Sequence, residues 1–232
     1  MKNMLKFASF GPLRIDGRFS GRMIAPAFMA IAAVAGVVTG SAPAMAQEGA
    51  RARDPQAEAF VDANARHVLM VLNDRRTSVE QRHQAFRSLI GDLVDWPRVT
   101  HFVLGKYART ASPDQLARFT AAYRTYAEGV YQHRIDDYRC NKAVVTGSQP
   151  RKPGDVIVVT ALTGVDNPQP VDLAWRVLNS GTGWKLVDVQ VKGVWLAITQ
   201  QQDFVATIDN HGGNMDVLIR QLITDAAAQQ QR

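Results

Sequence analysis

Hydrophobic positions in the first half of the chain recur with the spacing of amphipathic α-helices. Three stripes repeat at intervals of three or four residues. They are Phe60, Val68, Val71 and Leu72; Phe86, Leu89, Ile90, Leu93 and Val94; and Leu116, Phe119, Tyr123, Tyr126 and Val130. We therefore expect three main helices in this half of the chain.

Each stripe follows residues that commonly begin a helix. A capping side chain is followed by proline at the first helical position, or by Glu or Gln three residues later. These signals are Asp54-Pro55, Thr77 with Glu80, and Ser112-Pro113 with Gln115. Trp96-Pro97 is expected to end the second helix, with a short helix over residues 99–104 after it.

After Tyr138 the hydrophobic period changes from that of a helix to that of a strand. Four strands are expected, over residues 142–148, 156–162, 171–178 and 185–191. Apolar and polar residues alternate in the last two strands, so each has one apolar face. Two further helices are expected, one from about Val194 to Asn210 and one after Asn214.

The order of these elements predicts an α+β fold. N-terminal helices precede an antiparallel four-stranded meander sheet, and C-terminal helices follow it. Because each strand has one apolar face, the helices should cover one side of the sheet. We expect an apolar cavity between the sheet and the helices.

The first 46 residues have the three zones of a cleavable secretory signal. Residues 1–22 are basic, residues 23–40 are almost entirely apolar, and Ala44 and Ala46 form an A-x-A cleavage site. A membrane anchor is the alternative, but the apolar stretch is short for a bilayer span and rich in Ala and Gly. We expect residues 1–46 to be removed and residues 47–232 to form a single exported domain.

The predicted signal also changes how the charge is interpreted. The full chain has a formal net charge of +6, and removing the signal with its five basic residues and one acid leaves +2. The remaining basic residues do not cluster, which argues against nucleic-acid binding. One cysteine, Cys140, allows no internal disulfide.

Motifs for catalysis or metal binding are missing. The five histidines are scattered without metal-ligand spacing, and there is no Cys-x-x-Cys, G-x-S-x-G or phosphate loop. No metal or cofactor is therefore predicted. One alternative remains, a pocket enzyme acting on a lipid or isoprenoid through an acid or a tyrosine such as Asp188 or Tyr123. Asp188 is also explained as a strand residue bonded to a neighbouring helix end.

Three segments resemble the MlaC-like, or toluene-tolerance, family. Trp184 to Val194 is similar to its Trp-Lys-x-x-Asp-Val-x-x-x-Gly-Val block, residues 95–115 to its Leu-Gly and Thr/Ser-Pro-x-Gln segment, and residues 204–222 to its closing pattern. Two departures are Trp195 where the family usually has Ser, and glutamines at 200–202 where an Arg is usual. Leu196 to Gln200 resembles a hopanoid-associated branch of the family.

The resemblance implies a periplasmic lipid carrier, not an enzyme, that holds a phospholipid or a hopanoid. It would be the soluble component of an ABC-type lipid transport system. The implied partners are an inner-membrane ABC transporter complex and an outer-membrane lipoprotein complex, with transient contact at the membrane surface.

Such a carrier must bury lipid tails, which gain about 0.8 kcal/mol per methylene on leaving water. Trp195 is the candidate partner-binding residue. The candidate lipid-binding residues, each of which an ordinary core would explain equally well, are Phe86, Leu89, Phe119, Tyr123 and Tyr126 on the helices and Val171, Leu173, Trp175, Val187, Val189 and Val191 on the strands.

Overall fold

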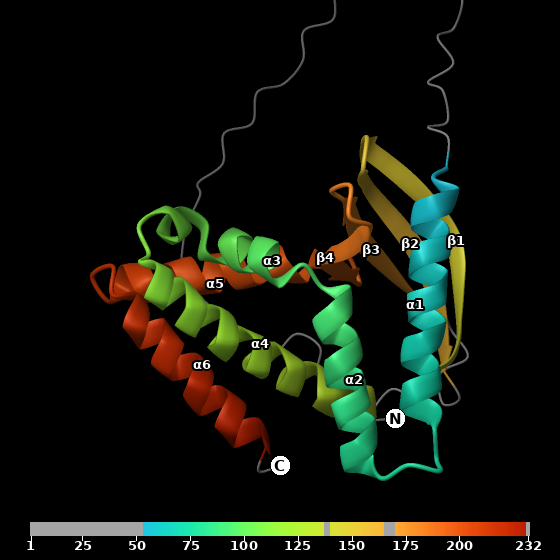
Figure 1. Ribbon diagram of the computed structural model, residues 1–232, viewed down its shortest axis with the longest axis horizontal. Coiled ribbons are helices and arrows are strands. Elements are labelled where there is room, and N and C mark those ends of the chain that lie inside the picture. Colours follow the sequence, from blue (N-terminus) through green and yellow to red (C-terminus); the bar gives the residue numbers. More distant parts are fainter. Residues whose placement is uncertain (1–52, 137–139, 165–169, 231–232) are drawn as a thin grey trace, which may run out of the picture. The chain divides into compact units, whose positions relative to one another are not determined.

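The computed structural model describes residues 53–136, 140–164 and 170–230 (Figure 1). The predicted secretory signal, residues 1–46, lies outside these ranges. The helices are α1 (Pro55–Asn73), α2 (Val79–Leu93), α3 (Trp96–Leu104), the 3-10 helix η1 (Gly105–Arg109), α4 (Pro113–Asp136), α5 (Leu196–Asn210) and α6 (Met215–Gln230). The strands are β1 (Cys140–Lys152), β2 (Asp155–Gly164), β3 (Val171–Asn179), β4 (Trp184–Val191) and β5 (Val194–Trp195). The fold is α+β, as predicted.

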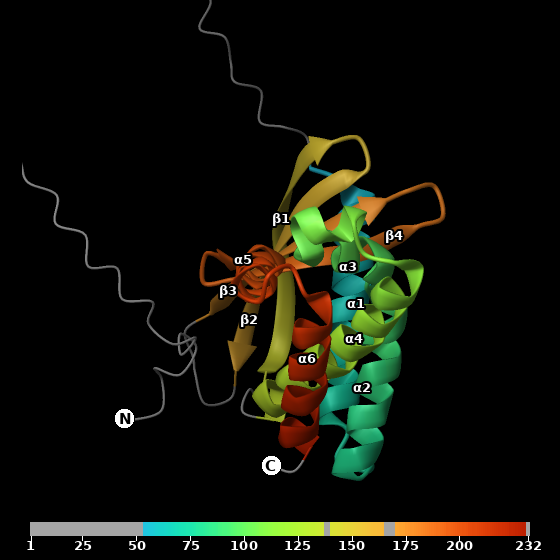
Figure 2. The ribbon, with the colours of Figure 1, turned by 90° about the vertical axis from the view of Figure 1, so that its left-hand side faces the viewer.

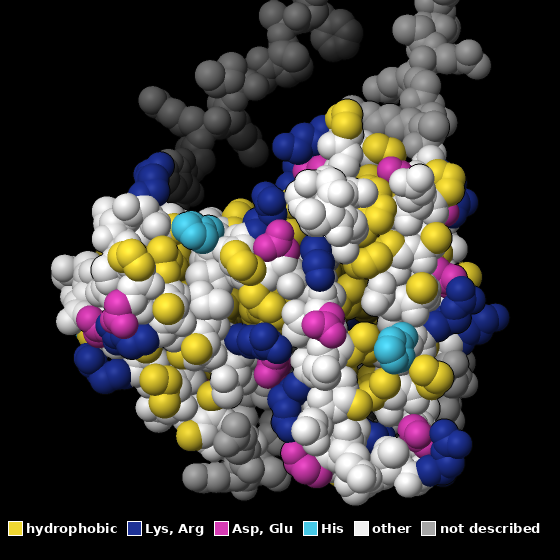
Figure 3. Space-filling model, viewed as in Figure 1, with side chains coloured by type: hydrophobic (Ala, Val, Ile, Leu, Met, Phe, Trp, Pro, Cys, Tyr) yellow, Lys and Arg dark blue, Asp and Glu magenta, His cyan; other side chains and the backbone are white. Residues whose placement is uncertain are grey.

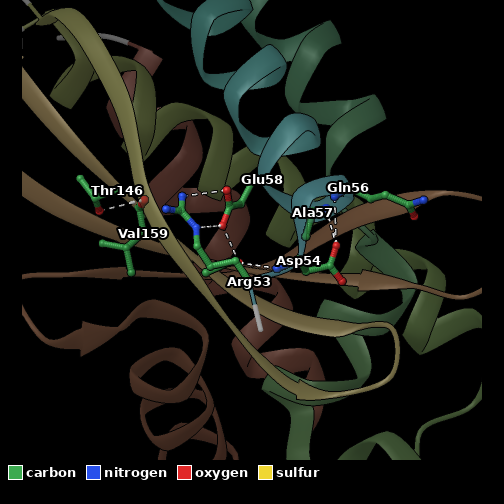
Figure 4. Close-up of polar contacts among 8 residues, drawn as sticks. Arg53, Asp54, Gln56, Ala57, Glu58, Thr146 and Val159 are labelled. Carbon is green, nitrogen blue, oxygen red and sulfur yellow. Dashed lines mark hydrogen bonds and ion pairs between the residues drawn. The ribbon is translucent and has the colours of Figure 1, made fainter. Parts of the chain in front are cut away.

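The N-terminus of α1 is capped as expected and is also fastened to β1. Asp54 accepts hydrogen bonds from the backbone N–H groups of Gln56 and Ala57. The Asp54 N–H donates to Ser148 Oγ on β1 (2.8 Å), and Ser148 donates to Glu58 Oε1 (2.7 Å). Arg53 pairs with the same carboxylate, as Figure 4 shows. These contacts fix the first turn of α1 against β1.

The N-cap of α2 is Ser78, one residue after the predicted cap Thr77. Ser78, and not Thr77, accepts from the backbone N–H of Gln81, and the Gln81 side chain accepts from the Ser78 N–H. The Thr77 hydroxyl instead donates to the Asp74 carbonyl, so it completes the preceding turn. The capping box of Ser112 and Gln115 at α4 is present as predicted.

The break between α2 and α3 comes earlier than expected. Trp96-Pro97 begins α3 and does not merely end α2, because a proline fits the first turn of a helix, where no N–H is needed. Asp95 caps α3 by accepting from the Arg98 N–H (3.1 Å). The Asp95 N–H donates to the Leu186 carbonyl of β4 (2.9 Å), so the α2–α3 corner is tied to the sheet.

The sheet is antiparallel, with strand order β1-β2-β3-β4-β5. It has one strand more than predicted. Lys192 (φ 50°) and Gly193 (φ 83°) turn the chain back tightly after β4, so that Val194 pairs with Val191 and Trp195 with Gln190. Helix α5 consequently begins at Leu196 and not at Val194.

One face of the sheet packs against α1, which lies alongside β1 (Figure 1). Val158, Trp175 and Val189 are directly paired across β2, β3 and β4, so their side chains share this face. The buried residues here form the sheet–α1 cluster: Ala57, Val61, Leu93, Val156, Val158, Val177 and Leu186.

A second core lies among the helices. Helices α4 and α6 run side by side in Figures 1 and 2. The buried residues form the helical cluster: Trp96, Val99, Val103, Leu104, Phe119, Ala122, Tyr123, Ala127, Val187, Ala197, Phe204, Ile208, Met215, Leu218, Ile219 and Leu222. Ile90 and Val94 contact both clusters, so the α2–α3 corner joins the two cores.

A β-bulge in β4 corrects the predicted alternation of that strand. Arg176 pairs with Asp188, but the next residue of β3, Val177, pairs with Leu186, which leaves Val187 as the extra residue. Val187 packs into the helical cluster, whereas Leu186 and Val189 pack in the sheet–α1 cluster. The expectation that Val187, Val189 and Val191 share one face is therefore wrong for Val187.

No helix among the residues described is long and apolar enough to cross a membrane.

Candidate functional site

The predicted site residues divide into two groups by burial. Phe86, Phe119, Tyr123 and Val187 are buried, and the last three belong to the helical cluster. The remaining seven are only half-buried: Leu89 and Tyr126 on the helices, and Val171, Leu173, Trp175, Val189 and Val191 on the strands. The half-buried group therefore keeps apolar surface that protein atoms do not cover.

Most of the half-buried strand residues lie on the sheet face that α1 covers only in part. Helix α1 contacts β1 and β2, while Leu173 and Trp175 on β3 and Val189 on β4 lie farther from it. Figure 3 shows hydrophobic side chains gathered in a hollow of the surface between α1 and the β3–β4 hairpin. We call the half-buried apolar residues Leu173, Trp175, Val189 and Val191, which the strand register places on one face of the sheet, the interlayer surface.

Trp175 presents an apolar ring on this surface because its polar atom is occupied. Its Nε1 donates to Thr160 Oγ1 on β2 (2.8 Å), and Thr160 is fully buried. A buried indole N–H normally needs such a partner. The hydrogen bond therefore holds the ring against the sheet without leaving an unsatisfied donor.

On the other face of β4, the side chain of Asp188 caps the start of helix α5. Its Oδ1 accepts from the backbone N–H of Ala197 (2.9 Å) and from that of Val189 (2.8 Å). Burial raises the pKa of Asp188, against the opposing effects of these two bonds and of Arg176. The interpretation of Asp188 as a strand residue bonded to a helix end is confirmed. Its Oδ1 thus bonds the backbone of β4 and of α5.

Arg176 and Asp155 form an ion pair next to this cap. The guanidinium donates to both carboxylate oxygens of Asp155 (3.0 and 2.9 Å), and Asp155 is 2% exposed. Burial by itself would raise the pKa of Asp155, but the hydrogen bonds and charge of Arg176, with help from Arg151 and Lys152, bring it below its ordinary value. The pair therefore stays ionised on this face of the sheet.

The side chain of Tyr123, the other candidate for acid–base chemistry, also makes structural contacts within the protein. Its hydroxyl donates to Gln200 on α5. Its ring stacks on Phe119 at a centroid distance of 5.7 Å and meets Phe204 edge-on at 5.5 Å. These contacts connect α4 to α5.

Comparison with known proteins identifies the family. Residues 45–224 match the family model described as MlaC protein. The chain belongs to the MlaC family. Among solved structures, it resembles a phospholipid-binding protein from Ralstonia solanacearum, determined in complex with a phospholipid at 1.53 Å. The two sequences are 24% identical, the match covers 75% of this chain and 99% of that chain, and the TM-score is 0.65.

In this MlaC-family chain, the block from Trp184 to Val194 has a clear structural purpose. It contains the bulge that sends Val187 into the helical cluster, the Asp188 cap of α5 and the Gly193 turn. The resemblance located this block, but alternation alone could not show the bulge.

Trp195, the candidate partner-binding residue, is half-buried in β5. Its neighbours Val194 and Ile198 are more exposed, at 53% and 41%. Nothing in the sequence distinguishes these two residues, because an exposed apolar side chain near the start of a helix looks like any other position of the stripe.

Two further features of the described part of the chain concern ligands. Those residues include no group of three or more His, Cys, Asp or Glu side chains that could hold a metal ion. An open depression of about 470 Å³ is lined by Val159, Pro170, Val171, Asp172, Ala174, Gln190, Lys192 and Gly193. Of the predicted site residues, only Val171 lies at this depression, so it is separate from the interlayer surface.

Proposed function

We propose that the protein is a periplasmic lipid carrier that holds a phospholipid or a hopanoid against the interlayer surface. Membership of the MlaC family supports this proposal, as does the likeness in fold to a protein solved with a phospholipid. The observation that carries it is the row of half-buried apolar side chains on β3 and β4, which the helices leave partly uncovered.

The energetics favour an apolar ligand at this place. Leu173, Trp175 and Val189 keep exposed surface although they share the sheet face on which α1 packs. Each Å² of apolar surface removed from water gains about 25 cal/mol, and each lipid methylene about 0.8 kcal/mol. A lipid tail lying on this surface would cover both its own apolar area and that of the protein.

Export would bring the carrier to the periplasm, between the two membranes. The predicted secretory signal of residues 1–46 would direct the domain of residues 47–232 to the periplasm. A carrier there would receive lipid from one membrane and deliver it to the other. The proposed partners are an inner-membrane ABC transporter complex and an outer-membrane lipoprotein complex, reached with transient contact at the membrane surface.

The proposed partner contact centres on Trp195. Val194 and Ile198 extend it with exposed apolar surface on β5 and α5. Lipid transfer needs no covalent step, and both Asp188 and Tyr123 are bound in structural hydrogen bonds. A carrier therefore suits this arrangement better than a pocket enzyme does.

Native mass spectrometry and lipidomics on protein purified from the periplasm test the proposal. We expect one bound lipid, whose identity distinguishes phospholipid from hopanoid. The variant Val189→Asp places a charge on the interlayer surface and should lower lipid occupancy at least tenfold, since an unpaired charge opposes burial. Val144→Asp is the matched control, because Val144 is 41% exposed on an edge strand. Wild-type protein that is uniformly lipid-free and takes up no offered lipid would refute the proposal.

A further inference from the structure

Helix α2, whose Leu93 packs in the sheet–α1 cluster with Trp175 and Val189, is weakly buried. Only Phe86 and Leu93 are buried among its 15 residues. Its C-terminal end is tied to β4, where the Asp95 N–H donates to the Leu186 carbonyl, and its N-terminal end is tied to the loop after α1, where Arg82 donates to the Thr77 carbonyl (2.6 Å). Segments with few buried apolar contacts open locally at low free-energy cost.

Arg124 of α4 lies directly on the backbone of α2 at Gly91. A Cβ atom added to Gly91 would come within 3.2 Å of the Arg124 Cζ and closer still to Nη2. The guanidinium therefore occupies the space that a side chain at residue 91 would take. The missing side chain at Gly91 leaves room for this approach, although glycine weakens a helix by about 1 kcal/mol relative to alanine.

Two other contacts hold the guanidinium in this position. Arg124 Nε donates to Glu128 Oε1 one turn later on α4 (2.7 Å), and Glu128 is buried. The Arg124 Cζ lies 5.8 Å from the ring of Trp96, the first residue of α3. Arg124 thus connects α4 to α2 and to the start of α3 at one point.

This point lies close to the interlayer surface. Ile90 and Leu93, on either side of Gly91 in α2, pack in the sheet–α1 cluster, and Trp175 and Val189 pack against the same cluster. A displacement of α2 at Gly91 would therefore loosen the packing next to Trp175 and Val189.

We propose that Arg124 is a clasp that holds α2 against α4 and so sets the rate at which the bound lipid leaves. This inference rests on the proposed lipid-carrier function. Arg124 is a positioning residue in it, because it acts through the placement of α2 and does not itself need to touch the lipid.

Three variants and one control test the clasp. Arg124→Lys keeps the charge for Glu128 but lacks the planar guanidinium that lies on Gly91 and Trp96. Gly91→Ala displaces the guanidinium by occupying its space. The double variant combines both changes. Arg118→Lys is the control on the same helix, since Arg118 pairs with Asp114 and Asp216 and contacts α6 rather than α2.

Release is measured as transfer of NBD-labelled phosphatidylethanolamine from loaded protein to phosphatidylcholine vesicles. We expect the rate constant to rise about fivefold in Arg124→Lys and in Gly91→Ala, with no change in Arg118→Lys. Since both changes remove the same contact, the double variant should also show about fivefold and not their product. An unchanged rate in the single variants, or a multiplied effect in the double variant, would overturn the clasp.

Hydrogen exchange separates this inference from the carrier proposal. Amides of α2 should exchange faster in Arg124→Lys than in wild-type protein and in Arg118→Lys. Equal α2 exchange in all three proteins refutes the clasp whether or not lipid binds. Wild-type protein that acquires neither the labelled phospholipid nor an offered hopanoid refutes the carrier proposal instead, and the exchange of α2 still decides on the clasp.

Discussion

Asp188 offers a sharp test of how β4 holds α5. The carboxylate accepts from the Ala197 N–H at the start of α5, where the N-cap residue Trp195 has no side-chain acceptor of its own. The substitution Asp188→Ala removes this cap. The substitution Asp188→Asn keeps an oxygen that can accept the same bond, but it removes the charge.

The structure suggests the size of both effects. Loss of a helix cap costs about 0.5–2 kcal/mol, and the second bond, to the Val189 N–H, adds up to about 1 kcal/mol. We expect Asp188→Ala to lower the free energy of unfolding by about 2 kcal/mol. Because burial raises the pKa of Asp188, the charge itself is unfavourable there. Asp188→Asn should therefore cost less than about 1 kcal/mol.

Urea unfolding monitored by tryptophan fluorescence measures both values at neutral pH. A folded-state pKa above the unfolded one means that Asp188 contributes stability below its unfolded pKa and loses that contribution as pH rises through the folded pKa. The deficit of Asp188→Asn relative to wild type should shrink over the same pH rise. If Asp188→Asn is as damaging as Asp188→Ala at neutral pH, the charge and not the cap supports α5, and the reasoning is wrong.

Two further substitutions test the surroundings of this cap. Arg176→Met leaves the buried Asp155 without its partner and should lower the free energy of unfolding by about 3 kcal/mol in urea titrations at pH 7. Because the pKa of Asp155 is lowered in the folded state, the stability that the pair contributes is present above the unfolded pKa and is lost as pH falls through the folded pKa. The difference in unfolding free energy between Arg176→Met and wild type should therefore narrow in acid. Gly193→Ala forces an L-residue to φ 83° and should cost about 1–2 kcal/mol, whereas Gly147→Ala, also with open space around the added Cβ but without a positive φ, should cost less than about 1 kcal/mol.

The helices were predictable because their stripes and caps are local. Asp54, Ser112 and Gln115 cap helices as their sequence context indicates. The cap at α2 was misplaced because Thr77 and Ser78 have the same chemistry, and only the turn that uses the Thr77 hydroxyl distinguishes them. Local pattern fixes that a helix begins, but not always at which of two equivalent residues.

The sheet shows where alternation stops being informative. A two-residue strand such as β5 is too short to show a period of two, and Lys192 gives no sign that its φ is positive. The bulge at Val187 shifts the alternation of β4 by one residue. Such irregularities depend on tertiary contacts, here between Val187 and the helical cluster, and the pattern of apolar and polar residues in the sequence does not reveal these contacts.

The candidate site was predictable as a set of apolar residues but not as a surface. Phe119 and Trp175 look equally suitable in the sequence, yet Phe119 is enclosed by Tyr123 and Phe204 while Trp175 keeps exposed surface. The two residues differ in how completely other side chains surround them in the folded protein. Arg124 and Gly91 were missed altogether, because a close approach between helices leaves no signal in the spacing of either residue.

Strand β4 connects the two cores of the fold. Leu186 and Val189 pack in the sheet–α1 cluster, Val187 packs in the helical cluster, and Asp188 caps α5. Pulling the two layers apart would break all of these contacts at once. Helix α2 has two buried side chains and one arginine against its backbone near its C-terminal end. Under the proposed carrier function, a displacement of α2 is therefore the opening that breaks fewer contacts, and we expect the exchange of a bound lipid to follow the strength of the contact between α2 and Arg124.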